Sequence, residues 1–382
     1  MTPSGTDEQR ALGNAVADLM AKHSTQAQVR ALMTTDGGFD PTVWRELAAM
    51  GLLGLAIPEQ HGGTGAGPVE LGIVAEEMGR ALLVGPFLST AVLVPSLLAA
   101  LGDTGEQAAV LPRIAAGELV ATLAFAEGST ARIPDTPETR ATVSTLKTRP
   151  GGGGQLTGIK NFVLDGLSAG LLYVLADTDA GPAVFAVEAD APGLEVTSLT
   201  TVDATRKQCR VRFADTPARM VGTPGVGVEA FTAALDHAAV ALLGEQAGGA
   251  RRAMEMACDY AKTRYQFGRA IGSFQAVKHL CADMLLEAES ATSAARFVAA
   301  AFAERSPTRL ADLALAQAYC SEAYVFIAAT NIQVHGGIGF TWEHPAHLYL
   351  RRARTDAQLL GEPSWHRERY LQQILRQPEP QR

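Results

Sequence analysis

The chain has 382 residues, of which 47% are apolar and 19% charged. This length allows two or three domains, and this balance is typical of a globular protein and excludes a disordered or fibrous chain. With 32 Lys and Arg against 40 Asp and Glu, the net charge is −8, which argues against nucleic-acid binding by phosphate neutralisation. The low aromatic share of 6% favours helices over an all-β fold.

The distribution of cysteine and histidine indicates neither a disulfide framework nor a metal site. The cysteines lie far apart without C-x-x-C spacing, and His344 and His347 have no further ligand nearby. The first twenty residues lack a basic stretch followed by an apolar run, and apolar stretches are broken before they could span a bilayer. We therefore expect a soluble cytoplasmic protein that does not enter a membrane.

Residues 1–117 show the spacing of helices. The segment 43–58 is amphipathic and ends at a Gly and a Pro, and the segment 69–84 places apolar residues three and four apart. Between these helices lies the loop 59–68, which holds the run Gly62–Gly67. This run lacks the strand-to-helix context of a dinucleotide-binding fingerprint, so we interpret it as a tight turn.

Residues 118–220 change to short runs rich in Val, Thr and Phe, separated by turn residues. This texture predicts an antiparallel β domain. The runs cover 119–127, 141–148, 171–178, 183–189, 194–199 and 208–215. The glycines Gly151–Gly154 are interpreted as a hairpin or strand connection, and residues 190–193 as a turn.

Residues 221–382 return to helical patterns. The segment 228–267 could form one helix of about ten turns, and 311–336 predicts another. Between them Ser273 is a plausible N-cap for a helix with one apolar stripe. The stripe consists of Phe274, Val277, Cys281 and Leu285. The tail 377–382 is expected to fray.

Two stretches, residues 264–275 and 333–340, combine hydrogen-bond donors with glycines at predicted helix ends. Arg264 offers a planar fork suited to phosphate. Gly336 and Gly337 would let a ligand approach the backbone amides closely. On spacing alone, both stretches could equally be corners between helices, with Arg264 in solvent.

These stretches, and the helix–strand–helix order around them, resemble the acyl-CoA dehydrogenase family. RYQFGRAIGSFQAVKH (264–279) and QVHGGIGF (333–340) resemble its C-terminal bundle, PEQHGG (58–63) its N-terminal lobe, and LTGIKNFVLDG (156–166) its β domain. The resemblance implies a mainly α fold with a central antiparallel β domain. Its domains would be an N-terminal helical domain (1–117), the β domain (118–220) and a C-terminal four-helix bundle (221–382).

The resemblance further implies FAD as cofactor and α,β-dehydrogenation of an acyl-CoA. In that reaction a carboxylate removes the α-proton and the β-hydrogen leaves as hydride to the flavin. An electron-transfer flavoprotein would accept the electrons. Six residues would contact an FAD bound mainly by a neighbouring subunit: Arg264, Phe267, Gln275, Gln333, Gly336 and Gly337.

The catalytic base is missing from both positions at which the family carries it. Leu360 and Ala238 occupy those positions, and Asp236 would point away from the face of Ala238. Glu362 precedes a proline, which leaves its direction open. Glu245 lies on the face of Ala238, about 10 Å along the helix, in an apolar stretch that would raise its pKa. It is a candidate base or a structural hydrogen-bonding residue.

The flavin-ring side departs from the family as well. Members of the family carry two threonines whose hydroxyls help to hold the flavin ring. The first is absent from the stretch Phe125–Ser129 and the second from Lys160–Leu164, where Phe162 keeps an aromatic ring. The chain resembles subunits of bacterial heteromeric acyl-CoA dehydrogenases of steroid side-chain degradation, in which two unlike chains share an FAD site. The alternatives are a homo-oligomer with Glu245 as base, a flavin oxygenase, and a non-catalytic partner.

Overall fold

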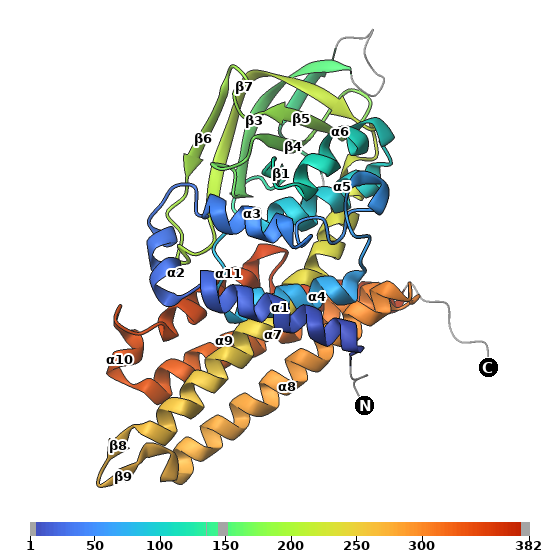
Figure 1. Ribbon diagram of the computed structural model, residues 1–382. Coiled ribbons are helices and arrows are strands. Elements are labelled where there is room, and N and C mark those ends of the chain that lie inside the picture. Colours follow the sequence, from blue (N-terminus) through green and yellow to red (C-terminus); the bar gives the residue numbers. More distant parts are fainter. Residues whose placement is uncertain (1–4, 135, 144–151, 376–382) are drawn as a thin grey trace, which may run out of the picture. The chain divides into compact units, whose positions relative to one another are not determined.

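A computed structural model describes residues 5–134, 136–143 and 152–375 (Figure 1). The chain forms two compact units, and each is built from separate stretches of sequence. Unit 1 consists of Met1–Val29, Pro68–Leu83 and Ala239–Arg382, and unit 2 of Arg30–Gly67 and Val84–Ala238. The three-domain division at residues 117 and 220 stays a prediction.

Unit 1 is helical. Its first helix, α1, begins after a capping box, in which Thr6 and Gln9 exchange side-chain-to-backbone hydrogen bonds of 3.0 and 3.2 Å. Helix α9 packs against α8, α11 and α12 and forms the centre of the bundle (Figure 1). The elements are α1 (Asp7–His23), α4 (Pro68–Arg80), α8 (Gln275–Ala303), α9 (Arg309–His335), α10 (Gly337–Phe340), α11 (Ala346–Leu359) and α12 (Pro363–Leu375). Helices α2 (Gln26–Met33) and α7 (Gly227–Thr263) each contribute to both units.

The backbones of α4 and α7 touch through glycines. A Cβ atom added to Gly244 would lie 2.5 Å from the carbonyl oxygen of Gly72, which is too close for any real contact. One added to Gly248 would collide with the carbonyl oxygen of Glu76, and one added to Gly79 with that of Glu245. Only hydrogen fits at these three positions. The glycines therefore set the distance between the two helices and the position of Glu245 relative to α4.

Unit 2 places short helices beside a sheet. Asp40 caps α3 through the amide of Thr42, and Asp103 caps α6 through the amide of Glu106. The glycine-rich loop is a tight turn, as predicted: Thr64 and Gly65 donate their amides to the carbonyls of residues 54 and 57. The helical elements are α3 (Pro41–Ala49), η1 (Glu59–His61), the π-helical η2 (Phe87–Leu93), α5 (Val94–Leu101) and α6 (Thr104–Ala115).

The seven-stranded sheet runs in the order β1-β4-β5-β7-β3-β2, and β6 also pairs with β7. Every pair of these strands is antiparallel except β1 with β4, which is parallel, so the sheet is mixed. Its buried core includes Phe185, Val211 and Phe213. The strands are β1 (Ala121–Ala124), β2 (Arg140–Val143), β3 (Gly153–Leu164), β4 (Leu171–Ala176), β5 (Ala183–Glu188), β6 (Leu194–Ser198) and β7 (Gln208–Val221).

The long helix predicted over 228–267 is confirmed as α7, which ends four residues earlier. The N-cap prediction for Ser273 is wrong. Helix α8 begins at Gln275, and the Ser273 hydroxyl instead donates to the carbonyl of Ala270 at 2.7 Å, within the short helix η3 (Ile271–Ser273). Of the predicted stripe, Phe274, Val277 and Cys281 are half-buried, whereas Leu285 is exposed and its neighbour Met284 is buried instead. The tail 377–382 and the connection 144–151 lie outside the described residues.

Candidate functional site

The structure brings the two informative stretches together at one end of the helical unit. Tyr260, in the last turn of α7, stacks on His335, the last residue of α9, with ring centroids 4.3 Å apart. Arg264 follows directly after α7, and Gln333 lies in the last turn of α9. Both side chains are exposed. The ends of α7 and α9, some seventy residues apart in the sequence, are therefore in contact.

A short hairpin projects beyond Arg264 (Figure 1). It consists of β8 (Tyr265–Gln266) and β9 (Arg269–Ala270), joined by a turn in which Phe267 and Gly268 both have positive φ, 52° and 76°. Phe267 is 91% exposed, and its ring meets Phe274 edge to face at 6.2 Å. The turn thus holds a large apolar side chain in solvent, ready to pack against a bound group or another chain.

Gln275 and the glycine corner complete this surface. Gln275 is the first residue of α8, exposed, with its Nε2 3.1 Å from Nε2 of His279. Gly336 ends α9 with a φ of 64°. No atom comes within 4 Å of a Cβ built on Gly336 or Gly337, so the backbone there faces open space. An exposed guanidinium beside bare backbone suits a phosphate-bearing cofactor such as FAD.

Phe162 lies in unit 2, at an irregularity of β3. The register between β3 and β7 shifts between Lys160 and Val163, and Phe162 has a φ of 55°, which is strained for an aromatic residue. The bulge turns Phe162 off the strand's regular alternation, and the ring is half-buried. Strained bulges of this kind are typical of sites that re-aim one side chain, and the role implied for Phe162 by the resemblance stays a prediction.

Beside the bulge lies a buried ion pair that sequence reasoning missed. Lys160 is fully buried, and its Nζ donates to Oε1 of Glu127 at 2.5 Å and to the carbonyl of Phe125 at 3.3 Å. Burial lowers the pKa of Lys160 to about 8, although Glu127 opposes this shift. Burial alone would raise the pKa of Glu127, but hydrogen bonds from Lys160, the Glu138 amide and Thr139 together lower it. The sequence around a lysine in a strand does not indicate which distant carboxylate it pairs with.

Neither position at which the resemblance predicts a base carries a carboxylate. Ala238 is fully buried in α7, and Leu360 is buried where α11 ends. Glu245 is 13% exposed in its side chain and pairs with Arg352 of α11, whose Nη1 lies 2.5 Å from Oε1. The second Nη of Arg352 donates to the carbonyl of Leu83 at 3.2 Å. A guanidinium favours the charged carboxylate, so Glu245 lies in a paired and not merely apolar environment.

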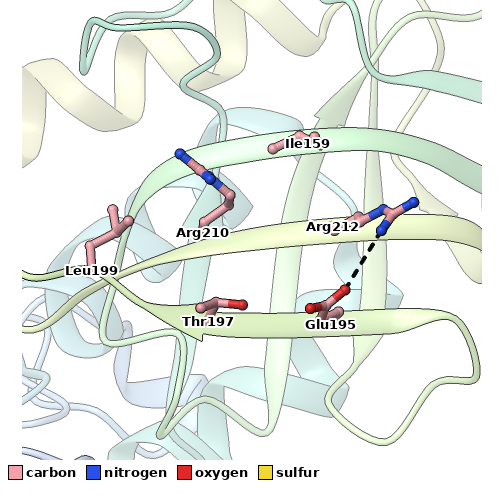
Figure 2. A pocket seen from close by; sticks show the side chains of 6 residues that line it. All are labelled: Ile159, Glu195, Thr197, Leu199, Arg210 and Arg212. Carbon is pink, nitrogen blue, oxygen red and sulfur yellow. Dashed lines mark ion pairs between the residues drawn. The ribbon is translucent and has the colours of Figure 1, made fainter.

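One hollow of about 380 Å³ lies on the outer face of the sheet, over β3, β6 and β7 (Figure 2). Arg212 and Glu195 face each other across its floor at 3.9 Å, while Ile159 and Leu199 form its apolar edges. Its polar groups are exposed, and none of the predicted site residues lines it. We assign it no role.

The remaining observations concern the cysteines, the metal-ligating side chains and helix α7. Within the described ranges, the four cysteines are free and no group of three or more His, Cys, Asp or Glu side chains could hold a metal ion. Among the described helices, α7 is long and apolar enough to cross a membrane by composition. However, 67% of its most apolar window is buried in the folded chain, as in the core helix of a packed protein.

Comparisons with known proteins agree with this geometry. Residues 6–118 match the acyl-CoA dehydrogenase N-terminal domain, and residues 225–375 match the acyl-CoA dehydrogenase C-terminal domain. The acyl-CoA dehydrogenase IpdE2 of Mycobacterium tuberculosis is 35% identical over 95% of both chains. Together the two domain matches cover more than half of the chain.

Solved structures show the same likeness. The steroid ACAD Tcur3481-Tcur3483, solved as a variant, is 31% identical with a TM-score of 0.85 over 97% of this chain and 98% of that one. The ChsE4-ChsE5 complex from Mycobacterium tuberculosis is 29% identical with a TM-score of 0.88, over 99% of this chain and 100% of that one. The chain therefore belongs to the acyl-CoA dehydrogenase family, whose members are FAD-dependent oxidoreductases that act on acyl-CoA.

Proposed function

We propose that this chain is one subunit of a hetero-oligomeric acyl-CoA dehydrogenase that shares its FAD with a homologous partner chain. The reaction is the α,β-dehydrogenation of an acyl-CoA thioester. The observation that carries the proposal is an imbalance within the chain. Arg264, Gln333 and Gly336, which the resemblance assigns to the cofactor, are all exposed, whereas apolar residues occupy both expected base positions, Ala238 and Leu360.

Each residue of the exposed surface has a role that follows from its chemistry. Arg264 would pair with the pyrophosphate, Phe267 would pack beside it, and Gln275 would lie near the adenosine. Gln333 would donate from the end of α9, and the bare backbone of Gly336–Gly337 would let the cofactor approach. Bound FAD would supply the hydride acceptor of the reaction. Phe162 would lie against the flavin ring of a site in unit 2.

The partner would supply the base that removes the α-proton. The assignment of this role to Glu245 stays a prediction, and the ion pair with Arg352 offers it a structural role instead. The structural neighbours support a partner, since one is described as a complex of two differently named chains. Because another is described as a steroid ACAD, we propose a steroid-derived acyl-CoA as the substrate class. An electron-transfer flavoprotein is proposed as the acceptor.

Co-expression with a homologous partner chain, followed by FAD quantitation and turnover, tests the proposal. We expect the complex to retain FAD and to oxidise a steroid side-chain acyl-CoA faster than a straight-chain acyl-CoA of similar length. Arg264→Ala in the complex should release FAD, and Arg264→Lys should restore only part of the binding, because lysine lacks the bidentate fork.

Four outcomes would contradict the proposal. A chain that alone binds stoichiometric FAD and turns over acyl-CoA indicates a homo-oligomer. A complex that stays colourless indicates a non-catalytic partner. Rapid reoxidation of the reduced complex by oxygen indicates a flavin oxygenase. Full FAD retention by Arg264→Ala would show that the exposed surface of α7 and α9 is not the cofactor site.

A further inference from the structure

Three aromatic rings form a continuous stack behind the glycine corner. His335 lies in the middle, with Tyr260 at 4.3 Å and 27° on one side and His344 at 4.2 Å and 39° on the other. The rings come from three segments: the last turn of α7, the last residue of α9, and the loop between α10 and α11. His335 is 5% exposed, while the outer rings are half-buried.

Hydrogen bonds fix the two imidazoles of the stack. Nδ1 of His335 donates to the carbonyl of Asn331 at 2.8 Å, because a carbonyl can only accept. Nδ1 of His344 accepts from the amide of Ala346 at 3.2 Å. Burial lowers the pKa of His335, so its ring is neutral at neutral pH and stacks without the cost of a buried charge. The ring planes are therefore held by bonds as well as by contact.

The stack joins the parts of the proposed cofactor surface. The amide of Arg264 donates to the carbonyl of Tyr260 at 2.8 Å, so Tyr260 lies one helical turn beneath Arg264. His335 immediately precedes Gly336, which with Gly337 has no side chain to pack, so the corner is held by its backbone hydrogen bonds and by the packing of His335 and Gly339. Contact between Tyr260 and His335 thus sets where the corner lies relative to the guanidinium.

From this geometry we infer that Tyr260, His335 and His344 are positioning residues for the phosphate-bearing cofactor. They hold the Gly336–Gly337 backbone and Arg264 in one arrangement before the cofactor binds. The rings themselves do not touch the cofactor. This inference rests on the proposed function, because it takes the surface of Arg264 and Gly336 as the FAD site.

The test uses the chain in complex with its partner and follows FAD binding by the quenching of flavin fluorescence. Loss of both ring contacts in His335→Ala should weaken FAD binding about tenfold, in line with the strength of aromatic pairs. His335→Phe keeps the stack and loses only the hydrogen bond to Asn331, and it should restore binding to within about threefold of wild type. Tyr260→Ala removes one of the two ring contacts and should weaken binding less than His335→Ala does.

A second readout needs no cofactor. Amide hydrogen exchange of residues 336–340 in the FAD-free complex should speed up about tenfold in His335→Ala and stay near the wild-type rate in His335→Phe. His366→Ala is the matched control, since it removes another buried histidine, whose ring meets Trp365 edge to face at 4.9 Å in the first turn of α12. It should lower the melting temperature without changing FAD affinity or exchange at the corner.

The outcomes separate the two proposals. If wild type binds FAD and Arg264→Ala releases it, but His335→Ala changes neither affinity nor exchange, the positioning role is overturned and the proposed function stands. The positioning role is also overturned if His335→Phe is as weak as His335→Ala, or if His366→Ala weakens FAD binding equally. If the wild-type complex binds no FAD, the proposed function and the positioning role are both overturned.

Discussion

Each unit of the molecule contains an ion pair in which both side chains are largely buried, and these two pairs differ in the cation. In unit 1, Glu245 of α7 meets Arg352 of α11, with side chains 13% and 4% exposed. In unit 2, Glu127 meets the fully buried Lys160 of β3. Both bonds measure 2.5 Å. A guanidinium keeps its charge at every pH a protein tolerates, whereas an ammonium can lose its proton when buried.

The difference shows that buried pairs of similar geometry can serve different ends. Arg352 also donates a hydrogen bond to the carbonyl of Leu83 and therefore links α11 to the segment after α4. Because the guanidinium stays charged, this link does not depend on pH. Lys160 has its pKa lowered by burial to about 8, so its pair can be discharged at moderately alkaline pH. The Lys160–Glu127 pair lies beside the strained Phe162. The Arg352–Glu245 pair includes the residue of α7 whose carbonyl is closely approached by Gly79 of α4.

The largest expected effect comes from removal of the permanent cation. Arg352→Met leaves Glu245 buried without this partner, and we expect the free energy of unfolding to fall by about 3–5 kcal/mol. Urea denaturation followed by circular dichroism measures the change. A loss below about 1 kcal/mol would mean that water reaches Glu245 and that the pair is not a buried one.

Glu245→Gln is the companion variant, because glutamine still accepts a hydrogen bond from Arg352. We expect a loss of stability smaller than that of Arg352→Met and, in the FAD-loaded complex, turnover close to wild type. This variant also tests the base prediction directly. If turnover is abolished while FAD stays bound, Glu245 is the base and the partner does not supply it.

Removal of the titratable cation should cost somewhat less. Lys160→Met leaves Glu127 with the amide of Glu138 and the amide and hydroxyl of Thr139, which continue to bind its oxygens. We expect a loss of about 3 kcal/mol at pH 7. Equilibrium denaturation of this variant at pH 7 and again at pH 9.5 gives the comparison, and an equal loss at both values would refute a titratable Lys160.

The lowered pKa of Lys160 should also change how the stability of the wild-type protein depends on pH. Between pH 8 and 10.5 the folded chain binds fewer protons at Lys160 than the unfolded chain does. The free energy of unfolding should therefore rise with pH in this window, by about 2 kcal/mol at most from pH 7 to 9.5 relative to Lys160→Met. A parallel course of the two pH profiles would contradict the lowered pKa of Lys160.

The smallest effect on stability is expected at the bulge. Phe162→Asn loses apolar contact but suits the positive φ of this position, so the net change should stay within about 1 kcal/mol. The flavin absorption spectrum of the FAD-loaded complex should shift, because the variant removes the ring proposed to lie against the flavin. An unchanged spectrum would place Phe162 away from the flavin, whatever the stability shows.

The sequence predicted those helices and strands whose structure depends mainly on their own residues. The apolar spacing of 228–267 identified α7, and the short apolar runs at 171–178 and 183–189, bounded by turn residues, identified β4 and β5. The start of α8 was misplaced because a serine in a 3₁₀ turn looks like a cap when its acceptor is unknown. Neither ion pair could be predicted, since Glu245 and Arg352 meet only through the packing of α7 and α11.

The glycine contacts between α4 and α7 have a consequence for anyone who compares this chain with its relatives. Gly79, Gly244 and Gly248 leave no room for even one extra methyl group. In a relative with alanine at any of these positions, the two helices must lie farther apart. The residues equivalent to Glu245 and Arg352 would then be offset from each other. These three positions therefore act as a gauge, readable from sequence alone, of whether a relative keeps the same interhelical spacing.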